Sequence, residues 1–100
     1  MNEITTIIQR QAITIIRAYD KINIYCILPK LRYYSKNNYE DFENFKNDIC
    51  DDIHELSLDL KHNSDWYDVA TMNENIYCIN SLMVLYKRVR NEYFNYRGDI

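Results

Sequence analysis

The chain has 100 residues, of which 47% are hydrophobic and 27% charged, and its formal net charge at pH 7 is −3. This composition is typical of a folded globular chain, and the length suits one domain spanning residues 1–100. The single glycine and single proline exclude glycine-rich nucleotide-binding loops and disfavour sheets, because tight hairpins depend on glycine. The sequence therefore predicts an all-α fold.

Residues 3–27 make up the first predicted helix. Pro29 is expected to end it, because proline disfavours helix in the residue before it. A hairpin around Asp20 and Lys21 is the alternative, and residues 29–38 are expected to form a connection with room for a helical turn. The apolar residues of the helix recur in steps of three and four, at Ile4, Ile8, Ala12, Ile15, Tyr19, Ile22 and Cys26.

The second predicted helix follows Asn38, which is expected to be its N-cap, and ends near Lys61, His62 and Asn63. Its apolar residues again step by three and four, at Phe42, Phe45, Ile49, Ile53, Leu56 and Leu60. The opposite side of the helix carries a row of carboxylates, namely Asp48, Asp52, Glu55 and Asp59.

The third predicted helix begins after an N-cap at Ser64 or Asp65 and stops at Gly98. Thr71 and Glu74 have the spacing of a capping box, so the helix is expected to break near Asn73. Its apolar residues form two stripes, one of Val69, Met72, Ile76, Ile79, Met83, Tyr86 and Tyr93, and one of Cys78, Leu82, Leu85, Val89 and Tyr96.

Three long helices of this kind predict a small up-down-up bundle. The two apolar stripes of the third helix are wider together than one neighbouring helix requires. Either this helix is central and touches both others, or part of it pairs with a second chain. A homodimer is therefore one expectation.

The charge is unevenly distributed along the chain. Residues 1–37 carry six basic and two acidic groups, a net charge of +4. Residues 38–68 carry two basic and ten acidic groups (−8), and residues 69–100 carry four basic and three acidic groups (+1). One interpretation makes Asp48, Asp52, Glu55 and Asp59 an acidic surface for a basic partner. The other makes them a solvated helix face, partly offset by Arg10, Arg17 and the C-terminal basic residues.

The C-terminal stretch alternates basic and aromatic residues. Lys87, Arg88, Arg90, Tyr93 and Arg97 are candidates for a partner-binding face, because such residues follow phosphates, stack on bases and dominate protein interfaces. The alternative is that the aromatic residues belong to the core and the arginines pair with the carboxylates of the second helix.

Catalytic chemistry finds little support in the residue pattern. The densest set of ligating groups is Asp48, Asp51, Asp52, His54 and Glu55, but the inward positions of that helix are apolar and no nucleophile–histidine arrangement is evident. We therefore expect no catalytic residues, no metal site and no cofactor.

The cysteines and the N-terminus bear on location. Cys26, Cys50 and Cys78 are odd in number and widely spaced, which favours reduced thiols. The N-terminus does not resemble a signal peptide, and no run of 18 apolar residues suggests a membrane segment. We expect a cytoplasmic protein in a reducing compartment that does not interact with a membrane.

The favoured function is binding of another protein by a rigid helical surface. Abundant Ile, Asn and Tyr have AT-rich codons, which is typical of a phage, a large DNA virus or a low-GC bacterium. By analogy, a small acidic helical protein from a phage or virus is expected to be an adaptor or inhibitor that acts on a host factor. A dimeric nucleic-acid-binding protein using the basic and aromatic C-terminal helix is the first alternative. A small metal-dependent hydrolase using the acidic second helix is the second.

Overall fold

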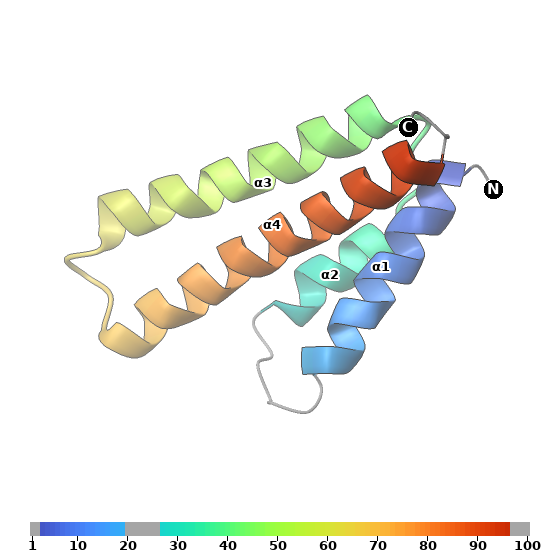
Figure 1. Ribbon diagram of the computed structural model, residues 1–100. Coiled ribbons are helices and arrows are strands. Elements are labelled where there is room, and N and C mark those ends of the chain that lie inside the picture. Colours follow the sequence, from blue (N-terminus) through green and yellow to red (C-terminus); the bar gives the residue numbers. More distant parts are fainter. Residues whose placement is uncertain (1–2, 20–26, 97–100) are drawn as a thin grey trace.

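The computed structural model describes residues 3–19 and 27–96 (Figure 1). Within these ranges all regular structure is α-helical and no strand occurs, which confirms the all-α prediction. The helices are α1 (Glu3–Tyr19), α2 (Leu28–Lys36), α3 (Phe42–Asn63) and α4 (Val69–Tyr96).

The prediction of three helices is wrong, because most of the expected connection 29–38 forms α2. Pro29 lies in the first turn of α2 instead of merely ending a helix before it. A proline is tolerated there because the first N–H groups of a helix have no intrahelical partner. The second part of the predicted first helix, residues 20–26, lies outside the described residues, as does the alternative hairpin around Asp20 and Lys21.

The predicted end of α3 near Lys61, His62 and Asn63 is confirmed, since the helix ends at Asn63, whereas the predicted N-cap is not. Asp41 caps the helix, and its Oδ1 accepts a hydrogen bond from the backbone N–H of Asn44 at 2.8 Å. Asn38 lies three residues earlier, in the stretch between α2 and α3. A carboxylate is a strong cap because it satisfies a free N–H and also faces the positive end of the helix dipole.

The expected caps of α4 at Ser64 or Asp65 are also wrong. Asp68 precedes the helix, and its Oδ1 accepts from the backbone N–H of Thr71 at 2.7 Å. The hydrogen bonds that the backbone N–H and the side-chain hydroxyl of Thr71 make to this carboxylate lower the pKa of Asp68. The helix then continues through Asn73 without the predicted break. Propagating a helix adds one hydrogen bond per residue, so a possible internal cap does not by itself interrupt the helix.

Helices α3 and α4 form a long antiparallel hairpin (Figure 1). Helix α1 packs against both α2 and α4, so the α1–α2 pair lies on one side of the hairpin. This pair covers the half of the hairpin that contains the start of α3 and the end of α4. The other half, with the turn at residues 64–68, extends beyond the pair (Figure 1).

The core lies where all four helices meet. Tyr34 of α2 and Phe45 of α3 are fully buried there, with ring centroids 6.0 Å apart in an edge-to-face arrangement. At the far end of the hairpin, by contrast, Trp66 is 85% and Val69 73% exposed. The core also contains Ile4, Ile7, Ile8, Ala12, Ile15, Ile27, Leu31, Tyr39, Phe42, Ile49, Cys78, Leu82, Leu85 and Val89.

Among the described residues, no helix has the combination of length and apolar composition needed to cross a bilayer.

Candidate functional site

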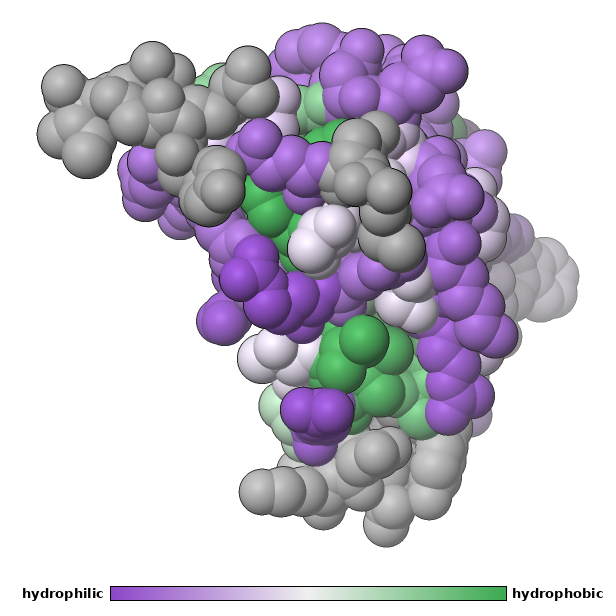
Figure 2. All heavy atoms as spheres, turned by 90° about the vertical axis from the view of Figure 1, so that its right-hand side faces the viewer, coloured by the Kyte–Doolittle hydropathy of each residue, from purple (hydrophilic) through white to green (hydrophobic). Residues whose placement is uncertain are grey.

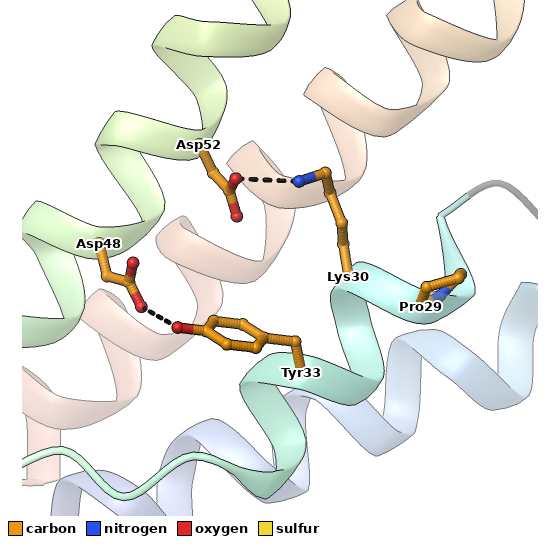
Figure 3. Close-up of a pocket in the computed structure, with 5 residues that line it drawn as sticks. All are labelled: Pro29, Lys30, Tyr33, Asp48 and Asp52. Carbon is orange, nitrogen blue, oxygen red and sulfur yellow. Dashed lines mark hydrogen bonds and ion pairs between the residues drawn. The ribbon is translucent and has the colours of Figure 1, made fainter.

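Asp52, the second residue of the predicted acidic row, contacts α2 (Figure 3). Its Oδ2 accepts a hydrogen bond from the hydroxyl of Tyr34 at 2.6 Å, and its Oδ1 lies 2.9 Å from Nζ of Lys30. Burial of Tyr34 and its bond to this carboxylate both raise the pKa of the phenol. Asp52 therefore has two partners within the protein and links α3 to α2.

Asp48, one turn earlier on α3, is bonded in the same way. Its Oδ2 accepts from the hydroxyl of Tyr33 at 3.2 Å and from the hydroxyl of Tyr39. Burial of Tyr39 and this hydrogen bond raise the pKa of Tyr39. In Figure 3, Lys30 and Tyr33 extend from α2 toward Asp52 and Asp48. A cavity of about 310 Å³ lies between the helices, lined by Pro29, Lys30, Tyr33, Asp48 and Asp52.

Asp59 is held near the far end of the hairpin. Its Oδ2 accepts from the hydroxyl of Tyr67 at 2.9 Å, and its Oδ1 accepts from the side-chain amide of Asn63 at 2.7 Å. Glu55 is exposed, whereas the three aspartates are half-buried. The predicted acidic row is therefore mostly a set of acceptors for tyrosine hydroxyls. In the sequence, the adjacent residues Tyr33 and Tyr34 were the feature that could have indicated these hydrogen bonds.

The expected pairing of Arg10 with the acidic helix is replaced by a contact with α4. Arg10 forms an ion pair with Glu92, and the amide of Gln11 donates to Glu92 Oε1 at 2.7 Å. Nε of Arg88 donates to the amide oxygen of Gln11, also at 2.7 Å. This network joins the middle of α1 to the C-terminal part of α4.

The predicted basic and aromatic residues do not lie together on one side of α4. Arg88 contacts α1 through Gln11, whereas the ring of Tyr93 stacks on Phe42 of α3 with centroids 5.6 Å apart. Lys87 and Arg90 are exposed on a third side. Arg97, like the predicted helix stop Gly98, lies outside the described residues.

This third side carries a continuous line of exposed residues, which we call the α4 stripe. Its members follow one another at alternating intervals of four and three, so they share one side of the helix. All eight are exposed and none is acidic: Val69, Asn73, Ile76, Asn80, Met83, Lys87, Arg90 and Phe94. The exposed fractions of the apolar members are 73% for Val69, 42% for Ile76, 40% for Met83 and 44% for Phe94.

The neighbours of α4 explain why the stripe is exposed. Tyr86 and Tyr93 face α3, with both rings close to Phe42, and Arg88 and Glu92 face α1. At about 100° per residue, the stripe falls on the remaining side of the helix. Phe94, at its C-terminal end, is 44% exposed and also contacts α3, because its ring lies edge-to-face with Phe42 at a centroid distance of 5.2 Å. A shallow depression of about 400 Å³ lies at its C-terminal end, lined by Arg90, Asn91, Phe94 and Asn95.

Sequence periodicity could not separate the stripe from the core. Val69, Ile76 and Met83 were grouped with Met72, Ile79, Tyr86 and Tyr93 in one predicted stripe. In the structure the second set is half-buried and the first is exposed. Successive members of the two sets lie only about 40–60° apart around a helix, so the position of α3 is needed to distinguish them.

A second apolar area occurs on the side of the molecule where α1 lies. Figure 2 shows this side as mostly hydrophilic, with hydrophobic residues gathered in its lower part. Ile13 of α1 is 41% exposed.

No three His, Cys, Asp or Glu side chains are arranged to hold a metal ion in the part of the chain that the structure describes. In comparisons with protein families, curated proteins and solved structures, nothing matches this chain.

Proposed function

We propose that this chain is a non-enzymatic protein-binding module and that the α4 stripe is its contact surface. The observation that carries the proposal is the line of four large apolar side chains exposed on one side of a single helix. Complete burial of such a side chain contributes about 1.5–3 kcal/mol. Covering four partly exposed ones therefore supplies a useful part of the free energy of binding.

The rigidity of α4 supports the same proposal. The helix runs from Val69 to Tyr96 without interruption, and its other sides pack on α3 and α1. A partner that covers the stripe would order few groups that were mobile beforehand. Binding to a preorganised surface avoids much of the entropy cost that weakens association with flexible segments.

A protein partner suits the surface better than a nucleic acid. Arg88 and Tyr93, two of the residues expected to contact a nucleic acid, make contacts with α1 and α3 instead. Affinity for a phosphate backbone grows with the number of basic residues that reach it. Arg88 is exposed as well but is bonded to Gln11, so Lys87 and Arg90 are the basic residues of the stripe, and their neighbours on it are the apolar Met83 and Phe94.

The metal-dependent hydrolase is also disfavoured. The carboxylates of Asp48 and Asp52 accept hydrogen bonds from tyrosines, and Asp52 pairs with Lys30. Recruiting these oxygens as metal ligands would break contacts that join α2 to α3.

The proposal includes an adaptor or inhibitor role inside the cell. Cys50 and Cys78, the cysteines among the described residues, are not joined in a disulfide, as in a reducing compartment. The residue composition supports a phage or viral source and a host factor as the partner.

Affinity capture from a lysate of the cells in which the protein is naturally made tests the proposal with a matched pair of variants. Ile76→Asn/Met83→Asn removes two apolar members of the stripe. The control variant, Tyr77→Asn/Val84→Asn, changes the residues that directly follow Ile76 and Met83. These side chains are 49% and 45% exposed, but they lie on another side of α4. Both variants place the same new residue, asparagine, in the same two turns of α4, so neither introduces a stronger helix breaker than the other.

We expect the stripe variant to capture about tenfold less of the partner, because apolar contacts at the centre of an interface supply much of the binding energy. The control variant should capture as much as the parent. Equal capture by both variants and the parent would contradict the choice of surface. A captured set indistinguishable from that of bare resin would contradict a protein-binding function.

A further inference from the structure

We infer that the partner segment is an amphipathic helix that docks along the α4 stripe and carries carboxylates beside its apolar residues, at the end nearest Lys87 and Arg90. This inference rests on the proposed function and adds the chemistry of the partner.

The shape of the stripe favours a helix as its occupant. At about 1.5 Å per residue, the stretch from Val69 to Phe94 extends about 38 Å. Its intervals of three and four are those at which another helix presents its own apolar side, so the two can interdigitate along their length. The backbone groups of α4 are bonded within the helix, so the stripe offers no sheet edge to an extended peptide.

The charges on the stripe define the flanks of that helix. The half nearer the start of α4 is neutral and amide-bearing, with Asn73 and Asn80 between the apolar residues. The other half carries Lys87 and Arg90, and neither forms an ion pair within the described residues. An apolar or basic surface that covered these two cations would remove their hydrating water and offer no opposite charge in its place. Carboxylates on the partner compensate that loss.

The same charges argue against a second copy of this chain as the occupant, although the width of the apolar arc suggested a homodimer. A second α4 stripe would present the same eight side chains, and none of them is acidic. It would leave Lys87 and Arg90 without opposite charges in any orientation, and in a parallel pairing it would place like charges together.

A displayed library of amphipathic helices tests the inference. Each member has fixed leucines on one side, and its flanking positions vary among Glu, Gln and Lys. The library is selected on the full chain, on Lys87→Glu/Arg90→Glu and on Arg32→Glu/Lys36→Glu. The last variant changes the net charge equally, through exposed residues of α2. Circular dichroism first verifies that each variant is folded.

We expect the parent and the α2 variant to enrich Glu at the flanks, and the α4 variant to enrich Lys. A Glu-flanked peptide selected on the parent should bind the α4 variant about tenfold more weakly, as expected for two reversed charge pairs. It should bind the α2 variant with an affinity within about twofold of that for the parent, because those charges are remote from the stripe.

Other outcomes overturn the inference and separate it from the proposed function. No enrichment, or the same flanks on all three proteins, rejects the acidic helix. If binders without charge preference still require Ile76 and Met83, only the inference fails. If binders do not require these residues, the proposed surface fails as well. A dimer seen by sedimentation and abolished by Ile76→Asn/Met83→Asn makes a second copy the occupant instead.

Discussion

The hydroxyl of Tyr34 lies 2.6 Å from Oδ2 of Asp52, so a fully buried ring of α2 has its polar atom bonded to the half-buried row of α3. A buried phenol requires such a partner, because an unbonded hydroxyl would lose its hydration without replacement. Part of the acidic row thus satisfies the tyrosines of the α2 region.

Replacement Tyr34→Phe should lower the free energy of unfolding by about 1.5–3 kcal/mol, as for loss of a hydrogen bond to a charged group. Tyr33→Phe is the matched control, because Tyr33 is exposed and its acceptor Asp48 keeps the bond from Tyr39. It should cost less than about 1 kcal/mol. Urea unfolding measures both, and equal losses would contradict the role given to the Tyr34–Asp52 bond.

Stability should fall in alkaline solution. Burial and the bonds to Asp52 and Asp48 raise the pKa values of Tyr34 and Tyr39. The folded state therefore favours the neutral phenols, and this contribution is complete below the unfolded-state pKa of about 10 and decreases as the pH rises above it.

Urea midpoints measured from about pH 8 to pH 11 should decrease toward the upper end of this range. The decrease should be smaller in Tyr34→Phe/Tyr39→Phe. It should be unchanged in Tyr77→Phe, which alters an exposed tyrosine of α4. Identical pH dependence in all three proteins would assign the alkaline loss to other groups.

Thr5 links α1 to the stretch between α2 and α3. Its buried hydroxyl donates to the carbonyl oxygen of Tyr39 at 3.0 Å and accepts from the N–H of Tyr39 at 2.9 Å. Thr5→Val keeps the shape but removes both bonds, so it should cost about 1–3 kcal/mol. Thr14→Val, at an exposed position of α1, should stay within about 0.5 kcal/mol of the parent in thermal or urea unfolding. A neutral Thr5→Val would contradict the stabilising role given to these two hydrogen bonds.

Leu85 and Met83 are neighbours on α4 with opposite environments, since Leu85 is fully buried and Met83 is 40% exposed. Leu85→Ala should lower the free energy of unfolding by about 2–5 kcal/mol because it leaves a cavity. Met83→Ala should change it by no more than about 0.5 kcal/mol, as usual for exposed positions. A large loss on Met83→Ala would mean that the α4 stripe is covered in the free protein.

A local sequence pattern predicted the structure correctly where it had one structural meaning. Where the same pattern was compatible with two structures, the sequence did not decide between them. The steps of three and four along α3 predicted a helix that ends near residues 61–63, and the observed helix ends at Asn63. Pro29 was ambiguous, because proline is compatible with the end of one helix and with the first turn of the next. The choice between them depended on buried contacts of α2, including those of Leu31 and Tyr34.

The candidate surface was only partly predictable. Lys87 and Arg90 were identified from composition, but grouping them with Arg88 and Tyr93 required knowledge of the neighbours of α4. The acidic row was identified as well, but tyrosine partners from α2 and from the stretches beside α3 decide what Asp48, Asp52 and Asp59 do.

The sequence by itself determined that this protein is helical, because the spacing of apolar residues and the scarcity of glycine act within each segment. Only the tertiary structure decided which sides of α4 are covered and which carboxylates are already bonded. These outcomes depend on where separate helices lie in space, and local periodicity contains no information on that.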